Sequence, residues 1–168
     1  MNMHDYIIRK ANISDLERLT EIYNQAIDAG YCTEDTKHFT PEERTPWFEK
    51  HQNNSYPMFV YELEEDVLGY SHISPHRKDI KTSGEVGEIS CYVDFYYHGF
   101  GIAKKLIDRT IQSAKELGYT NLIATLLDCN RESIALLKKY DFEMLETLPN
   151  TTKLGNKYCS HLCYGLKL

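Results

Sequence analysis

The sequence has no long hydrophobic run, and its purely apolar stretches extend over only a few residues. A membrane-spanning helix needs about 20 consecutive apolar residues, so we expect no membrane partner. The opening residues Met-Asn-Met-His-Asp also lack the apolar centre of a secretory signal. These two absences favour a cytoplasmic protein.

Excess positive charge is missing as well, because the net charge is −6. General nucleic-acid binding needs a basic surface, so nucleic acid is not an expected partner. An anionic ligand would have to be held by local donors and lysines. The candidate lysines for this role are Lys104, Lys105, Lys138 and Lys139. In the alternative interpretation, they are solvated lysines on the helix surfaces.

The five cysteines are an odd number and include no Cys-x-x-Cys pair. In a cytosolic protein this argues against a disulfide framework. Cys159, His161 and Cys163 alternate and would share one face of a strand. A structural zinc site has four ligands, so we expect these residues to pack in a terminal strand, with no metal.

No repeat, low-complexity segment or Pro/Ser-rich linker divides the 168 residues, which suit a single domain over 1–168. The hydrophobic periodicities predict the order β-α-α-β-β-β-α-β-α-β-β. This order gives a mixed α/β fold with a largely antiparallel sheet of about seven strands and helices on both faces. The predicted strands cover 6–9, 58–63, 67–74, 85–93, 122–127, 142–148 and 157–167, with a loop over 149–156 and a basic loop over 75–84.

Two helix starts have the sequence of a capping box. Ser14 with Glu17 predicts one start, and Thr40 with Glu43 predicts another. Gly30 is expected to end the first of these helices.

The most informative stretch is the strand 85–93, followed by a glycine turn at 98–101 and an amphipathic helix over 102–117. Unpaired N–H groups and the macrodipole at a helix start attract anions. Gly99 and Gly101 have no Cβ, so a phosphate could approach the backbone closely. The alternative is a tight strand-to-helix connection without a ligand. Gly101 is followed by Ile-Ala, which excludes the phosphate loop of nucleotide hydrolases.

The segment His98-Gly-Phe-Gly-Ile-Ala103 resembles the Gln/Arg-x-x-Gly-x-Gly/Ala motif of the GNAT N-acetyltransferases, with His98 where Gln or Arg is usual. Further segments resemble the phosphinothricin/methionine sulfone (L-amino acid) branch of that superfamily. In order, they are Ile22-Tyr-Asn-Gln-Ala-Ile27, Arg44-x-x-Trp-Phe-x-x-His51, Gly69-Tyr70, Glu88-x-Ser-x-Tyr-Val93 and Asn130-x-x-Ser-Ile-Ala135.

The resemblance implies acetyl-CoA as co-substrate and a β-bulge that splays the fourth strand from the fifth. It implies that backbone groups of the fourth strand hold the pantetheine arm and that the glycine turn holds the pyrophosphate. The implied cofactor-binding residues are Cys91, Tyr92, Val93, His98, Gly99, Phe100, Gly101, Ile102, Ala103, Lys104, Asn130 and Ser133.

Glu88 matches the family position of the general base, and Glu85 is its nearest competitor. A primary amine has a pKa near ~10, so a carboxylate is needed to take up its proton. The alternative for Glu88 is a solvated glutamate at a strand edge. Leu137 occupies the place where relatives have a Tyr or His proton donor, so the general acid stays unassigned.

For the acceptor, the resemblance implies a small amino-acid-like amine. Arg77 could pair with its carboxylate, while Tyr31, Arg44 and Trp47 could wall the pocket; surface pairing or core packing is the alternative for each. The resemblance also allows a homodimer. Two other functions stay open: a non-catalytic acyl-CoA-binding module and a protein or peptide N-acetyltransferase.

Overall fold

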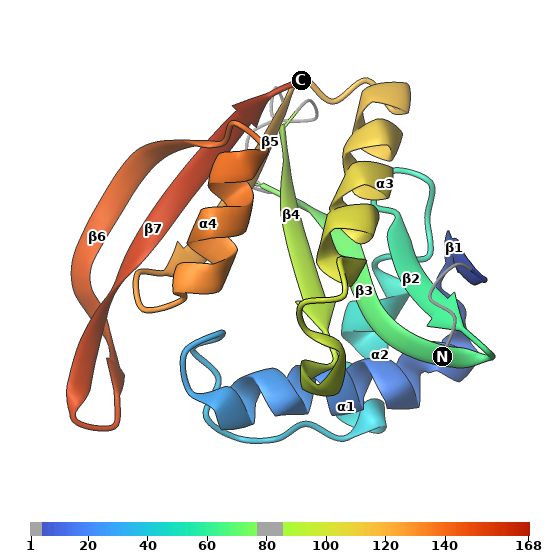
Figure 1. Ribbon diagram of the computed structural model, residues 1–168, viewed down its shortest axis with the longest axis horizontal. Helices are drawn as coiled ribbons and strands as arrows, with labels where there is room; N and C mark the ends of the chain where they lie inside the picture. Colours follow the sequence, from blue (N-terminus) through green and yellow to red (C-terminus); the bar gives the residue numbers. More distant parts are fainter. Residues whose placement is uncertain (1–4, 77–85) are drawn as a thin grey trace.

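The computed structural model describes residues 5–76 and 86–168, arranged as seven strands and four α-helices (Figure 1). The strands are β1 Tyr6–Lys10, β2 Met58–Leu63, β3 Asp66–Pro75, β4 Val86–Val93, β5 Asn121–Leu127, β6 Glu143–Leu154 and β7 Lys157–Lys167. The helices are α1 Leu16–Ala29, α2 Pro41–Glu49, α3 Ile102–Glu116 and α4 Arg131–Lys139. The predicted order of elements is confirmed. Within the described residues, no helix is long and apolar enough to cross a bilayer.

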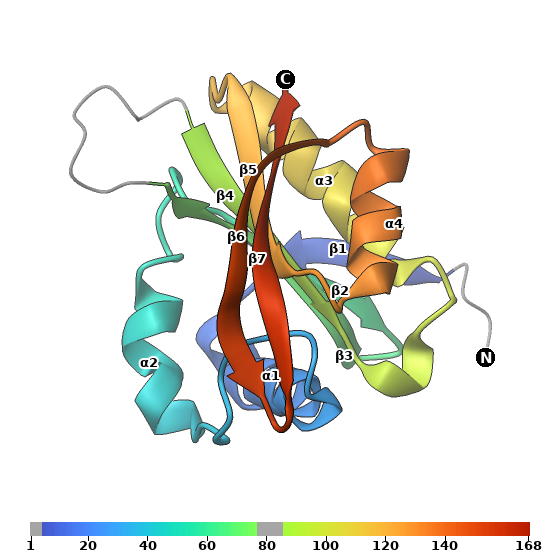
Figure 2. The same ribbon diagram turned by 90° about the vertical axis from the view of Figure 1, so that its left-hand side faces the viewer.

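The strands form one sheet in the order β1-β2-β3-β4-β5-β7-β6. Only the β4–β5 pair is parallel, and the other pairs are antiparallel. Helices α1 and α2 cover one face, and α3 and α4 cover the other (Figure 2). The mixed, mostly antiparallel sheet between helical layers is therefore as predicted.

The parallel pair is short. Residues 86–88 pair with 121–123, and beyond them β4 and β5 diverge (Figure 1). The register of β4 with β3 is unbroken, because 87–93 oppose 69–75 without a shift. The predicted splay of the fourth strand is thus present, but the predicted β-bulge is wrong, because β4 keeps an unshifted register with β3 over residues 87–93.

The burial of β5 is uneven, although the mostly apolar segment Leu122–Leu127 is typical of a strand buried on both faces. Leu122, Ile123, Ala124 and Leu127 are buried, but Thr125 is exposed and Leu126 is partly buried. The exposure begins two residues after Ile123, the last residue that pairs with β4, because the splay removes the neighbouring strand.

The prediction of a capping box formed by Ser14 and Glu17 is wrong. The box lies two residues earlier, where the Asn12 side chain accepts from the Ser14 N–H (3.0 Å) and the Asp15 carboxylate accepts from the Asn12 N–H (2.8 Å). Asp15 is also fixed by a 2.8 Å ion pair with Arg9. A 3-10 turn therefore precedes α1, and Glu17 has no part in the cap.

The loop predicted over 149–156 is also wrong, because β6 continues to Leu154 and only Gly155 and Asn156 form the turn. The register with β7 shifts between Leu148 and Thr152. Such a bulge accommodates Pro149, which has no N–H to donate to the ladder.

Other local signals are confirmed. The Thr40 side chain accepts from the Glu43 N–H, and the Glu43 carboxylate accepts from the Thr40 N–H. Gly30 ends α1 in the left-handed conformation, with φ 75. The hairpin between β2 and β3 turns through Glu64 and Glu65, both at positive φ.

The pairing of β4 with β5 depends on Gly87, and this gives a first prediction. A Cβ at Gly87 would lie 2.6 Å from Ile73 Cγ2 and 3.0 Å from the Tyr119 ring. We expect Gly87→Ala to lower the free energy of unfolding by about 1–3 kcal/mol through overpacking. Ile73→Ala alone leaves a cavity, but in the double variant the added methyl group occupies that space. Chemical denaturation of all four proteins should therefore show a double-variant loss smaller than the sum of the single losses. Strict additivity would contradict the proposed close contact.

Candidate functional site

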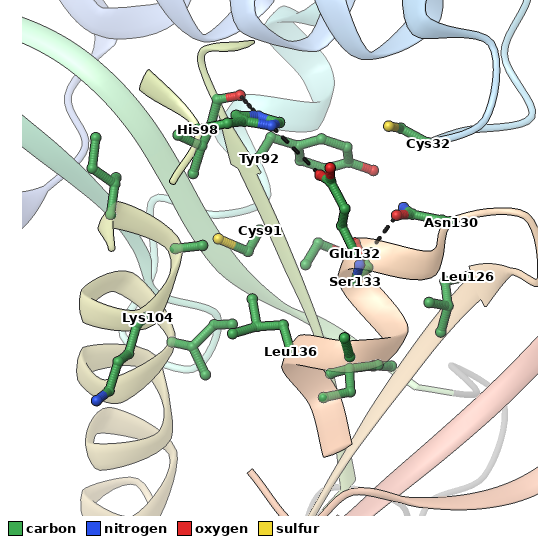
Figure 3. A pocket seen from close by; sticks show the side chains of 18 of the residues that line it. Cys32, Cys91, Tyr92, His98, Lys104, Leu126, Asn130, Glu132, Ser133 and Leu136 are labelled. Atoms are coloured by element: carbon green, nitrogen blue, oxygen red, sulfur yellow. Dashed lines mark hydrogen bonds and ion pairs between the residues drawn. The ribbon is translucent and has the colours of Figure 1, made fainter. Parts of the chain in front are cut away.

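The space between the diverging strands is a cavity of about 590 Å³ (Figure 3). It is bounded by β4 from Ile89 onward, the turn that precedes α3, the end of β5 and the first turns of α4. Its size lies within the range of small-molecule sites, which is about 300–1,000 Å³.

The glycine turn forms one wall. Gly99 (φ 84) and Gly101 (φ 79) are both left-handed, and Gly101 is the N-cap of α3. The Lys105 N–H bonds to the Gly101 carbonyl at 3.2 Å, so the N–H groups of residues 102–104 lie before the helical ladder and have no intrahelical acceptor. A Cβ added at either glycine would meet nothing within 4 Å. The turn therefore presents backbone donors and the positive end of a helix to open space.

The edge of β4 forms the second wall. The Asp94 N–H bonds to the Leu68 carbonyl at 2.9 Å, which fixes the alternation along the β3–β4 ladder. By that alternation Tyr92 exchanges its hydrogen bonds with β3, whereas the main-chain groups of Cys91 and Val93 point toward the cavity. The Val93 amide is therefore available to a ligand carbonyl, whereas the Tyr92 amide is used in the β3–β4 ladder. Desolvation raises the pKa of the Cys91 thiol to about 12.

His98 connects the two sides of the cavity mouth. Its Nε2 lies 3.0 Å from the Val93 carbonyl oxygen, and its ring stacks on Phe95 at 4.3 Å. Its Nδ1 lies 3.7 Å from the Glu132 carboxylate on α4, as Figure 3 shows. His98 therefore links the glycine turn to the end of β4 and reaches across the cavity mouth to α4.

The opposite wall is the start of α4. Asn130 is buried, and its side chain accepts from the Ser133 N–H at 3.2 Å, which confirms the helix cap. At the other end of α4 the Tyr140 hydroxyl lies 2.9 Å from the Lys104 carbonyl and 2.6 Å from Asp108. These bonds tie α4 to α3 and so set the width of the cavity.

The structure brings most of the predicted donor-site residues together. Phe100 does not line the cavity and is 57% exposed. Arg77 and Glu85 lie outside the described residues, as does most of the basic loop. The predicted residues that do line the cavity are Tyr31, Cys91, Tyr92, Val93, His98, Gly99, Gly101, Ile102, Ala103, Lys104, Asn130 and Ser133.

Glu88 lies at the branch point itself, in the last residue pair between β4 and β5. Its Oε1 accepts from the Thr125 hydroxyl at 2.6 Å, and its Oε2 lies 3.7 Å from His76 Nδ1. The sequence does not indicate Thr125, because the strand that contains it is otherwise apolar. His76 is also missed, since it belongs to no motif.

Trp47 packs in an aromatic layer between α2 and β3 and does not line the cavity. The Arg44 guanidinium lies 3.8 Å above its ring and 4.4 Å above the Tyr23 ring. Arg44 is only 7% exposed and donates to the Leu19 carbonyl at 3.3 Å. Within residues 5–76 and 86–168 no carboxylate pairs with it, so its charge is stabilised by aromatic faces.

Two buried histidines, His51 and His72, lie next to Trp47 in the same aromatic layer. The Ser74 hydroxyl lies 3.0 Å from His51 Nε2 and 3.2 Å from His72 Nδ1, and both rings are buried. Burial lowers the pKa of His51, and burial together with the neighbouring His51 and Arg44 lowers that of His72 well below its usual value. Both rings are therefore neutral in the folded protein.

Comparisons with known proteins agree with this geometry. The pattern of the acetyltransferase (GNAT) family matches residues 16–142. An L-methionine sulfoximine/L-methionine sulfone acetyltransferase of Salmonella typhimurium is 30% identical over 84% of this chain and 82% of its own. An N-acetyltransferase of Staphylococcus aureus is 34% identical, with a TM-score of 0.90 over 97% of this chain and 98% of its own. A phosphinothricin acetyltransferase of Sinorhizobium meliloti, solved with acetyl-CoA, is 26% identical, with a TM-score of 0.91 over 97% and 88%.

The neutral histidines give a prediction about pH. The folded-state pKa of His72 lies below its unfolded value of about 6.5, so the unfolded chain takes up the proton first as the pH falls. The contribution of neutral His72 to the free energy of unfolding is therefore fully present above pH ~6.5 and is lost as the pH falls below that value. Denaturation between pH 5 and 8 should show that His72→Gln reduces this slope by up to about 1.4 kcal/mol per pH unit. Equal slopes in the parent protein and in His72→Gln would contradict the assignment.

Proposed function

The chain belongs to the acetyltransferase (GNAT) family, and we propose that it moves an acetyl group from acetyl-CoA to the primary amine of a small amino-acid-like acceptor. The observation that carries the proposal is the cavity between β4 and β5, which ends at the open glycine turn. The Salmonella relative acts on methionine sulfoximine and methionine sulfone, and the Sinorhizobium relative is a phosphinothricin acetyltransferase; both support an acceptor of this size.

The donor would lie along the two backbone walls. The N–H groups of residues 102–104 would bind its diphosphate, because a helix start combines free donors with partial positive charge. The cavity-facing groups of Cys91 and Val93 would hold the pantetheine arm, with Asn130 opposite. Backbone groups do this work, which explains why the side chains of Cys91 and Val93 need no polar atom.

Glu88 would act as the general base. About one amine in a thousand is neutral at pH 7, so the acceptor ammonium must lose a proton as it attacks. The Thr125 hydroxyl fixes one carboxylate oxygen of Glu88 and leaves the other, on the His76 side, to take the proton directly or through water. The amine then forms its N–C bond, and the Val93 N–H would stabilise the negative carbonyl oxygen.

The C–S bond breaks without a proton from Leu137, which lines the cavity where an acid is expected. Coenzyme A can leave as a thiolate, because a thiol pKa near ~8.5 makes it a fair leaving group. The absence of a donor at this position therefore does not argue against catalysis.

The acceptor side is proposed more coarsely. Tyr31 lines the cavity and would contact the amine, and Arg77 is the proposed partner of an acceptor carboxylate. Trp47 would act indirectly, by holding the aromatic layer that contains Arg44. A single domain over 1–168, a cytoplasmic location and a homodimer complete the proposal.

The function is tested by measuring release of free coenzyme A over a panel of amines. The panel contains amino acids, their sulfone, sulfoximine and phosphinate analogues, polyamines and peptides. Release with small amino-acid-like amines supports the proposal. Release with peptides alone would favour a peptide N-acetyltransferase, and acetyl-CoA binding without release would favour a non-catalytic module.

A prediction on the donor site uses two left-handed glycines. Gly101→Val should abolish acetyl-CoA binding in calorimetry, because its side chain would occupy the open space before α3. Gly155→Val has comparable backbone strain in the β6–β7 turn and should bind acetyl-CoA as the parent does. Retained binding in Gly101→Val would place the diphosphate elsewhere.

The role of Glu88 as the base is tested by replacing carboxylates with uncharged amides. Glu88→Gln should lower kcat by about 10²–10⁴-fold while acetyl-CoA binding is retained. The exposed Glu143→Gln is the control and should leave kcat unchanged. Thr125→Val should lower kcat less than Glu88→Gln, because only the orientation of the carboxylate is lost. Full activity of Glu88→Gln would exclude its role as base.

A further inference from the structure

Two cysteines outside the cavity lie in contact, Cys129 in the turn after β5 and Cys159 on β7. β5 and β7 run from Asn121 opposite Lys167 to Leu127 opposite His161. The pairing continues for one more residue on each strand, because the Asp128 N–H bonds to the Ser160 carbonyl at 2.9 Å. Cys129 follows in the turn after β5, and Cys159 directly precedes Ser160 on β7. We propose that these two thiols form a reversible disulfide under oxidising conditions.

Two hydrogen bonds join Asp128 to Ser160 next to the cysteines. The Asp128 N–H bonds to the Ser160 carbonyl, and the Ser160 N–H bonds to the Asp128 side-chain Oδ1 at 3.0 Å. The chain then turns, because the Asn130 N–H bonds to the Leu127 carbonyl at 3.0 Å, and this turn places Cys129 beside Cys159. A disulfide has an S–S bond of about 2.05 Å. The Sγ atoms of Cys129 and Cys159 are 2.8 Å apart, so the bond needs little movement of the strands.

The surroundings make Cys129 the thiol that meets an oxidant first. Cys159 is 4% exposed, whereas Cys129 is only partly buried. The loop after α1 contacts Cys129 and β7, because the Tyr31 carbonyl accepts from the Cys129 thiol at 4.0 Å and Glu34 pairs with His161 at 2.8 Å. Burial and the neighbouring thiol raise the pKa of Cys129 to about 11. The thiolate fraction at pH 7 is therefore small, and oxidation is slow.

The oxidation balances with a peroxide as the oxidant. Peroxide takes two electrons from the Cys129 sulfur to give a sulfenic acid and one water. The Cys159 sulfur then attacks, the S–O bond breaks, and the oxygen leaves as a second water. Overall two S–H bonds are lost, one S–S bond forms, and one hydrogen peroxide becomes two waters. A dithiol reductant reverses the change.

The disulfide would reach the cavity through its neighbours. Cys129 directly precedes Asn130, whose side chain caps α4, and its thiol is the donor to the Tyr31 carbonyl. Oxidation removes that donor and ties the start of α4 to β7, while Tyr31 and Asn130 both line the cavity. This second consequence rests on the proposed function, but formation of the disulfide does not.

A metal ion is the competing explanation for the pair. An Asp128 carboxylate oxygen and the two Sγ atoms lie within 4.8 Å of one another. Structural zinc uses four ligands, and this cluster supplies three among the described residues. The side chain of Asp128 is also already engaged by the Ser160 N–H. The geometry therefore favours a disulfide over a structural zinc site.

The test is mass spectrometry of the intact, folded protein after treatment with hydrogen peroxide. We expect a loss of two hydrogen masses, a Cys129–Cys159 cross-linked peptide after digestion, and full reversal by dithiothreitol. Cys129→Ser and Cys159→Ser should each abolish the cross-link. Cys163→Ser, on the same strand as Cys159, should retain it. Unchanged mass, a cross-link between other cysteines, or thiols protected by stoichiometric zinc would overturn the proposal.

The consequence for the cavity is measured separately, as the dissociation constant for acetyl-CoA before and after oxidation. We expect the constant to rise at least threefold in the parent protein and to stay unchanged in Cys129→Ser. An unchanged constant in a fully cross-linked protein would remove the link to the cavity. If neither form binds acetyl-CoA, the proposed function fails, and the mass measurement still decides the disulfide.

Discussion

The cavity depends on the short parallel pairing between β4 and β5. Three opposed residue pairs join them, and the packing of Gly87 between Ile73 and Tyr119 holds that junction closed. Beyond it, the strands part while each keeps its antiparallel neighbour, β3 or β7. The sheet therefore opens a cavity without losing an outer strand. The main-chain groups that would have paired across the gap become available for a ligand.

Contacts at the far end of the gap keep the two halves of the sheet at a fixed spacing. Tyr140 bonds to α3, and His98 reaches from the glycine turn to Glu132 on α4. The loop after α1 contacts β7 through Glu34 and His161. These polar contacts lie at the surface of an otherwise apolar opening, and they hold its walls apart.

The sequence predicts those parts of the site that depend on local backbone chemistry. Gly99 and Gly101 lie where only left-handed residues fit, and the Asn130 cap follows from local helix rules. Contacts between distant strands leave no such signal. Thr125 meets Glu88, and Cys129 meets Cys159, only because strand registers bring them together. The predictions of a Ser14 cap and of a loop after Leu148 are wrong for a related reason. Asp15 bonds to Arg9, which lies on another element. Pairing with β7 accommodates Pro149 in a strand.

The alternation of side chains along β4 has a consequence for the order of chemical events. Glu88 and Cys91 differ by an odd number of positions and so lie on opposite faces of the strand. A thiol beside the donor's path could in principle accept the acyl group first and pass it on. Desolvation raises the pKa of Cys91 and so favours the protonated thiol, and its described neighbours on the same face of β4, Ile89 and Val93, carry no base. For the proposed transfer, this arrangement favours a ternary complex, in which acceptor and donor meet through the gap, over an acyl-enzyme.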